Sequence, residues 1–111
     1  MIVNMKGQHR GIIIAGLGAV GRAVLTLGGE VLDTFDEIFL IDRRDSVEDG
    51  LLPGKARMLR GDITDSAFLS EALEKIGKPA LFVNLCAGID NVRIRRMVGQ
   101  HDIAYLDSCC C

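Results

Sequence analysis

Aromatic residues are scarce in this 111-residue chain: they make up 5% of it, and tryptophan is absent. Because apolar residues still amount to 49%, a hydrophobic core has to be built mainly from Ile, Leu, Val and Ala. Long apolar runs are absent as well. None approaches the roughly 18 to 20 residues of a membrane-spanning helix, and residues 1–10 lack the apolar segment of a secretory signal. We therefore expect a cytoplasmic protein without a membrane partner.

An excess of charge of one sign is missing too. The chain has 13 basic and 15 acidic residues, a formal net charge of -2, whereas nucleic-acid-binding surfaces need clustered positive charge. The four cysteines are Cys86 and an adjacent trio at 109–111. That spacing matches neither the C-x-x-C pattern of a zinc site nor a disulfide framework. We expect reduced thiols, no metal site and no nucleic-acid partner.

Short apolar runs alternate with segments of helical periodicity along the chain. The runs predict strands, and the periodic segments, two of which start with Asp65 and Asp90 as caps, predict helices. Strands are expected at 11–15, 37–42, 56–60, 80–85 and 103–107, and helices at 19–32, 65–76 and 90–99. Such alternation forms a parallel sheet through right-handed crossovers. We therefore expect one α/β domain over residues 1–111, a doubly wound sheet of strand order 3-2-1-4-5 with helices on both faces.

A glycine-rich motif directly follows the first predicted strand. Residues 16–21 read Gly-Leu-Gly-Ala-Val-Gly, which matches G-x-G-x-x-G at the opening of a predicted helix. Gly16 permits the sharp turn out of the strand, Gly18 lets the backbone approach a pyrophosphate, and Gly21 allows close packing of helix on strand. The free N–H groups and the dipole of the first helical turn would face the phosphates. In this context the motif predicts a Rossmann fold of three αβα layers that binds a dinucleotide.

A carboxylate and two arginines follow the second predicted strand. Asp42 lies 21 residues after Gly21, close to the spacing of about 20 expected for the acid that binds the adenosine ribose. Such a carboxylate accepts hydrogen bonds from the ribose hydroxyls and repels a 2′-phosphate, so it favours NAD. Arg43 and Arg44 leave NADP open, because an arginine at this point can hold the 2′-phosphate. A solvated loop is the other interpretation of both arginines.

Two further segments lie at the carboxyl ends of strands, where a doubly wound sheet binds its ligand. Residues 61–63 follow the third strand, and Asp62 would reach the exocyclic amine of the adenine. Alternatively, Asp62 or Thr64 only begins the next helix. Residues 85–88 follow the fourth strand, where small side chains would leave room for the nicotinamide side of the cofactor. Alternatively, these residues form a simple turn between strand and helix. Cys86 is interpreted as a small buried residue rather than a nucleophile.

No catalytic set is recognisable in the sequence. Tyr105 is followed four residues later by Cys109 rather than lysine, which breaks the Tyr-x-x-x-Lys pattern of short-chain dehydrogenases. Neither histidine has an acidic partner at a suggestive spacing, and the arginines at 93, 95 and 96 are most simply the solvated face of a helix. Competing interpretations of the glycine motif are a turn without a ligand and a methyltransferase, whose pattern usually lacks the third glycine. A P-loop is excluded because no G-K-[ST] follows.

Three segments resemble the saccharopine dehydrogenase family, and within it the homospermidine synthases. They read Gly-Leu-Gly-Ala-Val-Gly-Arg-Ala-Val at 16–24, Phe-Val-Asn-Leu-Cys at 82–86 and Ala-Tyr-Leu-Asp-Ser-Cys at 104–109. The resemblance implies an NAD(P)-binding domain followed by a larger substrate domain. Such an oxidoreductase acts on carbon–nitrogen bonds of amino acids or polyamines by hydride transfer. This chain would then be an N-terminal fragment that binds the cofactor but lacks the catalytic domain.

The resemblance also assigns the cofactor contacts by position. It places the pyrophosphate against Gly16, Gly18, Ala19, Val20 and Gly21, the adenosine ribose at Asp42, the adenine at Asp62 and Ile63, and the nicotinamide side along Leu85, Cys86 and Ala87. Ser108 and Cys109 would face the cleft from the end of the fifth strand. A regulatory module that senses a nucleotide without catalysis is the alternative function. A non-binding remnant that supports a homo-oligomer is a third interpretation.

Overall fold

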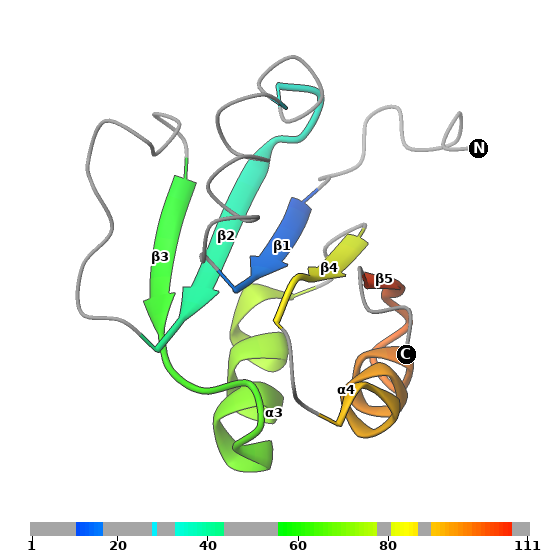
Figure 1. The fold of residues 1–111 in the computed structure, drawn as a ribbon. Coiled ribbons are helices and arrows are strands. Elements are labelled where there is room, and N and C mark those ends of the chain that lie inside the picture. Colours follow the sequence, from blue (N-terminus) through cyan, green and yellow to red (C-terminus); the bar gives the residue numbers. More distant parts are fainter. Residues whose placement is uncertain are drawn as a thin grey trace.

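Five parallel strands form a single sheet in the computed structural model of the chain (Figure 1). The structure describes residues 11–16, 28, 33–43, 56–77, 81–86 and 90–107. The strands are β1 (Gly11–Ala15), β2 (Glu37–Asp42), β3 (Ala56–Arg60), β4 (Leu81–Asn84) and β5 (Ala104–Asp107), in the order β3-β2-β1-β4-β5. Every neighbouring pair is parallel. The predicted strand order is therefore confirmed.

Three strands have the predicted bounds, and two are shorter. β4 ends at Asn84 rather than at residue 85, because the Asn84 side chain accepts the hydrogen bond of the Cys86 backbone N–H at 3.0 Å. β5 begins at Ala104 rather than at 103, directly after a turn in which Asp102 has a φ of 58°. Both differences arise where a local turn competes with the sheet for the backbone.

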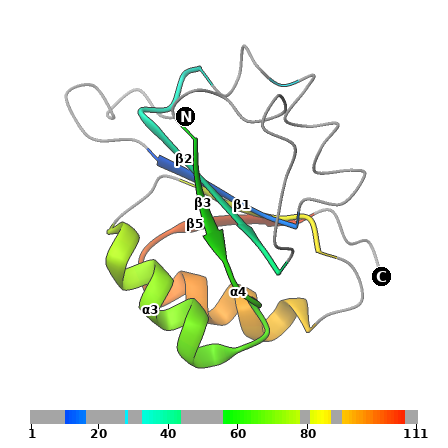
Figure 2. The same cartoon turned by 90° about the vertical axis from the view of Figure 1, so that its left-hand side faces the viewer.

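Two helices, α3 (Ser66–Ile76) and α4 (Asn91–Gly99), lie on the same face of the sheet (Figures 1 and 2). Helices on both faces were expected, but the helix predicted at 19–32 lies outside the described residues apart from Gly28. Within the part of the chain that the structure describes, neither helix has the length and hydropathy that a membrane crossing requires.

The ends of α3 and α4 follow from local sequence signals. The Asp65 carboxylate accepts hydrogen bonds from the backbone N–H groups of Ala67 (3.0 Å) and Phe68 (3.3 Å), and Asp90 accepts one from Arg93 N–H (3.2 Å). Such a cap stabilises a helix by about 1 kcal/mol. At the other end of α3, Gly77 has a φ of 93° and ends the helix. Both predicted caps are confirmed.

β1 is buried along its whole length because apolar clusters lie on both faces of the sheet. On the helix-covered face, the cluster includes Ile13, Phe39, Ile41, Phe82, Leu69, Leu73, Ile94 and Val98. On the opposite face, Ile12 and Ile14 pack with Phe35, Ile38 and Leu40. Each fully buried isoleucine contributes about 1.5–3 kcal/mol. This two-sided burial accounts for the continuous apolar run of β1, since neither face of the strand has to meet water.

Gly61 connects β3 to α3 in a confined space. Its backbone N–H donates to the Asp42 carbonyl at 2.8 Å, which holds the ends of β2 and β3 together. A Cβ at Gly61 would lie 2.2 Å from the Phe68 ring, and that ring packs against the core of the helix-covered face. A side chain at this position would therefore displace Phe68.

We expect Gly61→Ala to lower the free energy of unfolding by about 1–3 kcal/mol, because the Phe68 ring has to leave its packed position. Gly99→Ala is the matched control, since nothing lies within 4 Å of a Cβ at that position. Alanine at the end of α4 should be neutral or stabilising by up to about 1 kcal/mol. Urea denaturation measures both variants, and equal losses would contradict the packing argument.

Candidate functional site

The carboxyl ends of β1, β2 and β4 meet around Gly16. β1 has β2 on one side and β4 on the other, so the strand order reverses at β1. The Gly16 N–H donates to the Ile41 carbonyl at 2.9 Å, and the Leu85 N–H donates to the Ala15 carbonyl at 2.8 Å. In open parallel sheets, ligands bind just outside the carboxyl ends of the strands at such a point. The candidate site is therefore this edge of the sheet.

Gly16 occupies a position that no other residue fits. Its φ is 94°, a conformation that residues with a Cβ rarely adopt. A Cβ would also lie 2.9 Å from the Cys86 backbone nitrogen and 3.0 Å from the Leu85 carbonyl carbon. The predicted role of Gly16 in the turn out of the first strand is thus confirmed. The other predicted pyrophosphate contacts, Gly18, Ala19, Val20 and Gly21, lie outside the described residues.

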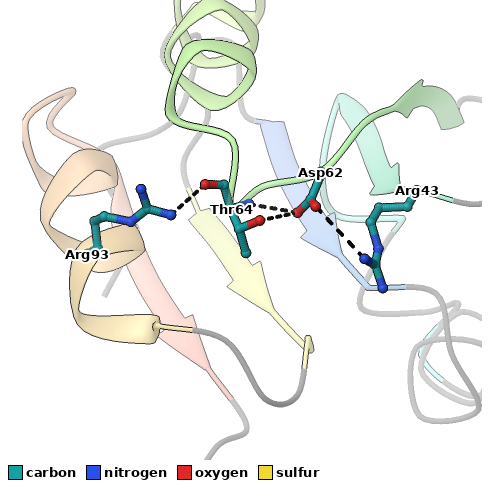
Figure 3. A network of polar contacts seen from close by, with 4 residues as sticks. All are labelled: Arg43, Asp62, Thr64 and Arg93. Atoms are coloured by element: carbon teal, nitrogen blue, oxygen red, sulfur yellow. Dashed lines mark hydrogen bonds and ion pairs between the residues drawn. The ribbon is translucent and has the colours of Figure 1, made fainter.

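Asp42 and Arg43 lie at the carboxyl end of β2, as the sequence predicts. Asp42 is the last residue of the strand and is half-buried. The Arg43 side chain is 78% exposed, and its Nη1 lies 3.9 Å from Oδ2 of Asp62. An exposed pair of this kind contributes no more than about 1 kcal/mol. Its effect is to place one guanidinium against a carboxylate from the neighbouring strand end (Figure 3).

Asp62 lies in the loop that follows β3 and organises that loop with one carboxylate oxygen. Its Oδ1 accepts hydrogen bonds from the Thr64 N–H (2.9 Å) and the Thr64 hydroxyl (2.7 Å). These two bonds lower the pKa of the Asp62 carboxyl. The N-cap of α3 is Asp65, so the alternative in which Asp62 or Thr64 begins the helix is wrong. The neighbouring Ile63 side chain is buried in the core, which leaves only its backbone to face a ligand.

Asn84 is a fully buried polar residue, and the sequence alone does not show which way its side chain points. Its Nδ2 donates to the Tyr105 hydroxyl (2.9 Å) and to Oδ1 of Asn91 (3.1 Å), while its Oδ1 accepts from the Cys86 N–H (3.0 Å). The side chain therefore joins the end of β4 to a side chain of β5 and to the start of α4. In the sequence, Asn84 stands out as a polar residue inside an apolar strand and as part of the 82–86 segment that carries the family resemblance. Its role is to hold the turn after β4 in place.

Cys86 follows that turn and is a half-buried free thiol. Burial raises the pKa of this thiol, and the carboxylates of Asp42 and Asp62 raise it further, whereas Arg43 opposes the change. A thiol with a raised pKa is a weak nucleophile at neutral pH. This agrees with the interpretation of Cys86 as a packing residue. Leu85 is also half-buried, and Ala87 lies outside the described residues.

Arg93 differs from the sequence prediction. Arg95 and Arg96 are exposed, as expected for a solvated helix face, but Arg93 is half-buried. Its guanidinium donates to the Thr64 carbonyl and, at 2.8 Å, to the Ser66 hydroxyl. The prediction that Arg93 lies on a solvated helix face is therefore wrong. The spacing of arginines within α4 does not show that the start of α3 lies within reach of Arg93.

The described residues include neither a metal-binding cluster nor an ionised phenol at neutral pH. No set of three or more His, Cys, Asp or Glu side chains in them is arranged to hold a metal ion. The Tyr105 ring stacks on Phe82 at 5.9 Å between centroids, and burial is the main cause that raises the pKa of its phenol. A raised pKa makes the phenolate a rare species at neutral pH.

Several solved structures share this arrangement. One is the enzyme WbmG of Bordetella bronchiseptica in complex with NAD and UDP, with a TM-score of 0.68 and 18% identity over 90% of this chain. Another is the MycE methyltransferase of the mycinamycin biosynthetic pathway in complex with Mg and SAH (TM-score 0.71, 17% identity, 96% of this chain). A third is a short-chain dehydrogenase/reductase of Veillonella parvula (TM-score 0.67, 14% identity, 90% of this chain).

The chain has a Rossmann-like α/β fold. This conclusion rests on the agreement of strand order and on the TM-scores, because identities of 14–18% establish the fold alone. The chain spans 37%, 29% and 47% of the lengths of these three proteins, in the order given. No protein-family model matches the sequence. A search of curated proteins likewise finds no match.

We expect Gly16→Ala to lower the free energy of unfolding by about 2–5 kcal/mol, because a left-handed backbone conformation and a contact with fixed backbone atoms penalise the same Cβ. Gly99→Ala again serves as the control. Chemical denaturation followed by circular dichroism measures the change. A loss below that of Gly61→Ala, where only a side chain has to move, would contradict this account.

The raised pKa of Cys86 predicts slow alkylation. The rate of iodoacetamide modification at Cys86 should rise with pH to an inflection above 9.0, the ordinary value for the thiol. Asp42→Asn should accelerate the reaction at pH 8 by roughly two- to fivefold, because removing the carboxylate stabilises the thiolate. Mass spectrometry of the Cys86 peptide gives the rate. Asp102→Asn, a change of the same charge elsewhere, should leave it unaltered; an inflection below 9.0 would refute the assignment.

Proposed function

We propose that this chain is the NAD-binding domain of an oxidoreductase and that it holds the dinucleotide at the carboxyl edge of its sheet. The observation that carries the proposal is the Gly16 turn. It opens the G-x-G-x-x-G motif at the reversal of strand order, where no side chain fits between the ends of the strands. A bare backbone at that point is what a pyrophosphate needs for close approach. The NAD complex of WbmG, with its similar fold, supports the proposal.

The remaining parts of the dinucleotide are assigned along the edge. Asp42 accepts hydrogen bonds from the adenosine ribose, and Asp62 together with the Ile63 backbone faces the adenine. The nicotinamide side lies along Leu85, Cys86 and Ala87. This order follows the strands outward from β1, with adenosine over β2 and β3 and nicotinamide over β4.

NAD is favoured over NADP by the charges at the end of β2. Asp42 repels a 2′-phosphate. Arg43, the residue that would attract one, already lies against the Asp62 carboxylate at 3.9 Å. Binding a 2′-phosphate would therefore require Arg43 to leave Asp62 and to approach a group that Asp42 opposes. We retain NADP as the weaker ligand.

The reaction is proposed from sequence resemblance alone. The segments at 16–24, 82–86 and 104–109 resemble saccharopine dehydrogenases and homospermidine synthases, which transfer a hydride at carbon–nitrogen bonds. We propose this reaction class for the whole protein, with a further domain supplying the substrate site. The proteins of similar fold are only 14–18% identical to this chain, so they do not indicate its substrate.

A methyltransferase is the second candidate, because MycE was solved with SAH and has a similar fold. SAH carries an adenosine but no pyrophosphate. The third glycine, at position 21, favours a dinucleotide, since a methyltransferase motif usually lacks it. The two candidates differ in ligand and are separated by the same experiment.

Isothermal titration calorimetry with NAD, NADP and SAH tests the proposal. We expect NAD to bind with a Kd of roughly 10–1,000 µM, equivalent to about 4–7 kcal/mol of binding free energy. NADP should bind more weakly. Asp42→Asn should weaken NAD by about tenfold or more, because a charge-assisted hydrogen bond contributes about 1.5–3 kcal/mol. The same substitution should reduce the difference in affinity between NAD and NADP.

Asp102→Asn is the matched control, because it removes an exposed carboxylate on the turn before β5 and should leave both affinities unchanged. Binding of SAH without NAD would support the methyltransferase instead. Failure of folded protein to bind any of the three ligands would overturn the proposal.

A further inference from the structure

Arg93 connects two helices at the candidate site by contacts that cross a long stretch of sequence. It lies in the first turn of α4, and its guanidinium reaches the start of α3, where it donates to the Ser66 hydroxyl (2.8 Å) and to the Thr64 carbonyl. The two bonds join residues 27 and 29 positions apart. The planar guanidinium can make both at once, which an ammonium group cannot do in the same geometry.

Thr64 passes this restraint to Asp62. The Thr64 N–H and hydroxyl both donate to Oδ1 of Asp62, at 2.9 and 2.7 Å. The Asp65 N–H donates to the Asp62 carbonyl at 2.9 Å and closes the loop. Figure 3 shows the resulting series, in which Arg93 contacts Thr64, Thr64 contacts Asp62, and Asp62 contacts Arg43. With Oδ1 occupied in this way, Oδ2 is the oxygen that remains directed toward Arg43.

We propose that Arg93 is a positioning residue that sets the direction of the Asp62 carboxylate toward the adenine base. This inference rests on the proposed dinucleotide site. Arg93 itself does not touch the cofactor in this assignment; it acts through Thr64. Its consequence is base selectivity, because a carboxylate held in one direction accepts a hydrogen bond from the adenine amine and repels a carbonyl at the same ring position.

The alternative is that Arg93 only ties α4 to α3. In that case its removal would weaken the fold and reduce the affinity for every nucleotide equally. If Arg93 instead acts through the Asp62 carboxylate, its removal should reduce the preference for adenine over other bases. It should also change the titration of Asp62.

The test compares NAD with nicotinamide hypoxanthine dinucleotide, in which a carbonyl replaces the adenine amine. Wild-type protein should prefer NAD. Arg93→Ala should weaken NAD by about tenfold, a change of roughly 1.4 kcal/mol, and should leave the hypoxanthine analogue within about twofold of its wild-type affinity. Arg96→Ala, an exposed arginine on the same helix, is the matched control and should change neither.

A second measurement follows the Asp62 carboxyl by NMR titration. Because the Thr64 bonds lower the pKa of Asp62, loosening Thr64 in Arg93→Ala should raise that pKa toward 3.8, the ordinary value. Arg93→Lys keeps the positive charge but cannot make both bonds in the same geometry. It should shift affinity and pKa in the same direction by a smaller amount, and it replaces Arg93→Ala if that variant does not fold.

Equal weakening of both dinucleotides, or an unchanged Asp62 pKa in the Arg93 variants, would overturn the inference. Failure of the wild-type protein to bind NAD would instead overturn the proposed function. In that case the Asp62 titration still decides whether Arg93 positions the carboxylate.

Discussion

The close approach of three strand ends at Gly16 is the constraint on which the candidate site depends. The Gly16 N–H bonds to the end of β2, and its Cα lies so near the Leu85–Cys86 backbone that a methyl group has no room. A side chain at Gly16 would push the end of β1 away from the Leu85–Cys86 backbone. The glycine motif, which begins at Gly16, would then start from a different position relative to β2 and β4.

Around that turn, short polar contacts fix the ends of the outer strands. Gly61 bonds to the Asp42 carbonyl and holds β3 to β2, and Asn84 holds the end of β4 to β5 and α4. Burial raises the pKa of the Cys86 thiol, and the carboxylates of Asp42 and Asp62 raise it further. The Asp62 carboxylate also lies 3.9 Å from the Arg43 guanidinium. Polar contacts within the protein therefore hold the strand ends together, and the Cys86 thiol at this edge is not an activated nucleophile.

The fold by itself does not select the ligand. Proteins solved with NAD and with SAH share it at closely similar TM-scores, 0.68 and 0.71. What separates the two ligands here is the glycine spacing: the third glycine, at position 21, suits a pyrophosphate, whereas an acid after the second strand is found in both classes of protein. The proposal of an NAD site depends on these residues, whereas the proposal of carbon–nitrogen chemistry depends on sequence resemblance. Evidence against one of the two proposals therefore leaves the other unaffected.

The sequence by itself indicated the caps at Asp65 and Asp90 and the turn at Gly16, because capping and the lack of a Cβ are local properties. It also indicated the strand order, because alternating strands and helices joined by right-handed crossovers allow few topologies. Only the tertiary structure decided that Asn84 meets Tyr105 and that Arg93 meets Ser66 and Thr64. These hydrogen bonds join residues 21 to 29 positions apart, and whether such groups meet depends on how the helices pack on the sheet. An arginine on a solvated helix face and one that reaches another helix have the same local sequence pattern.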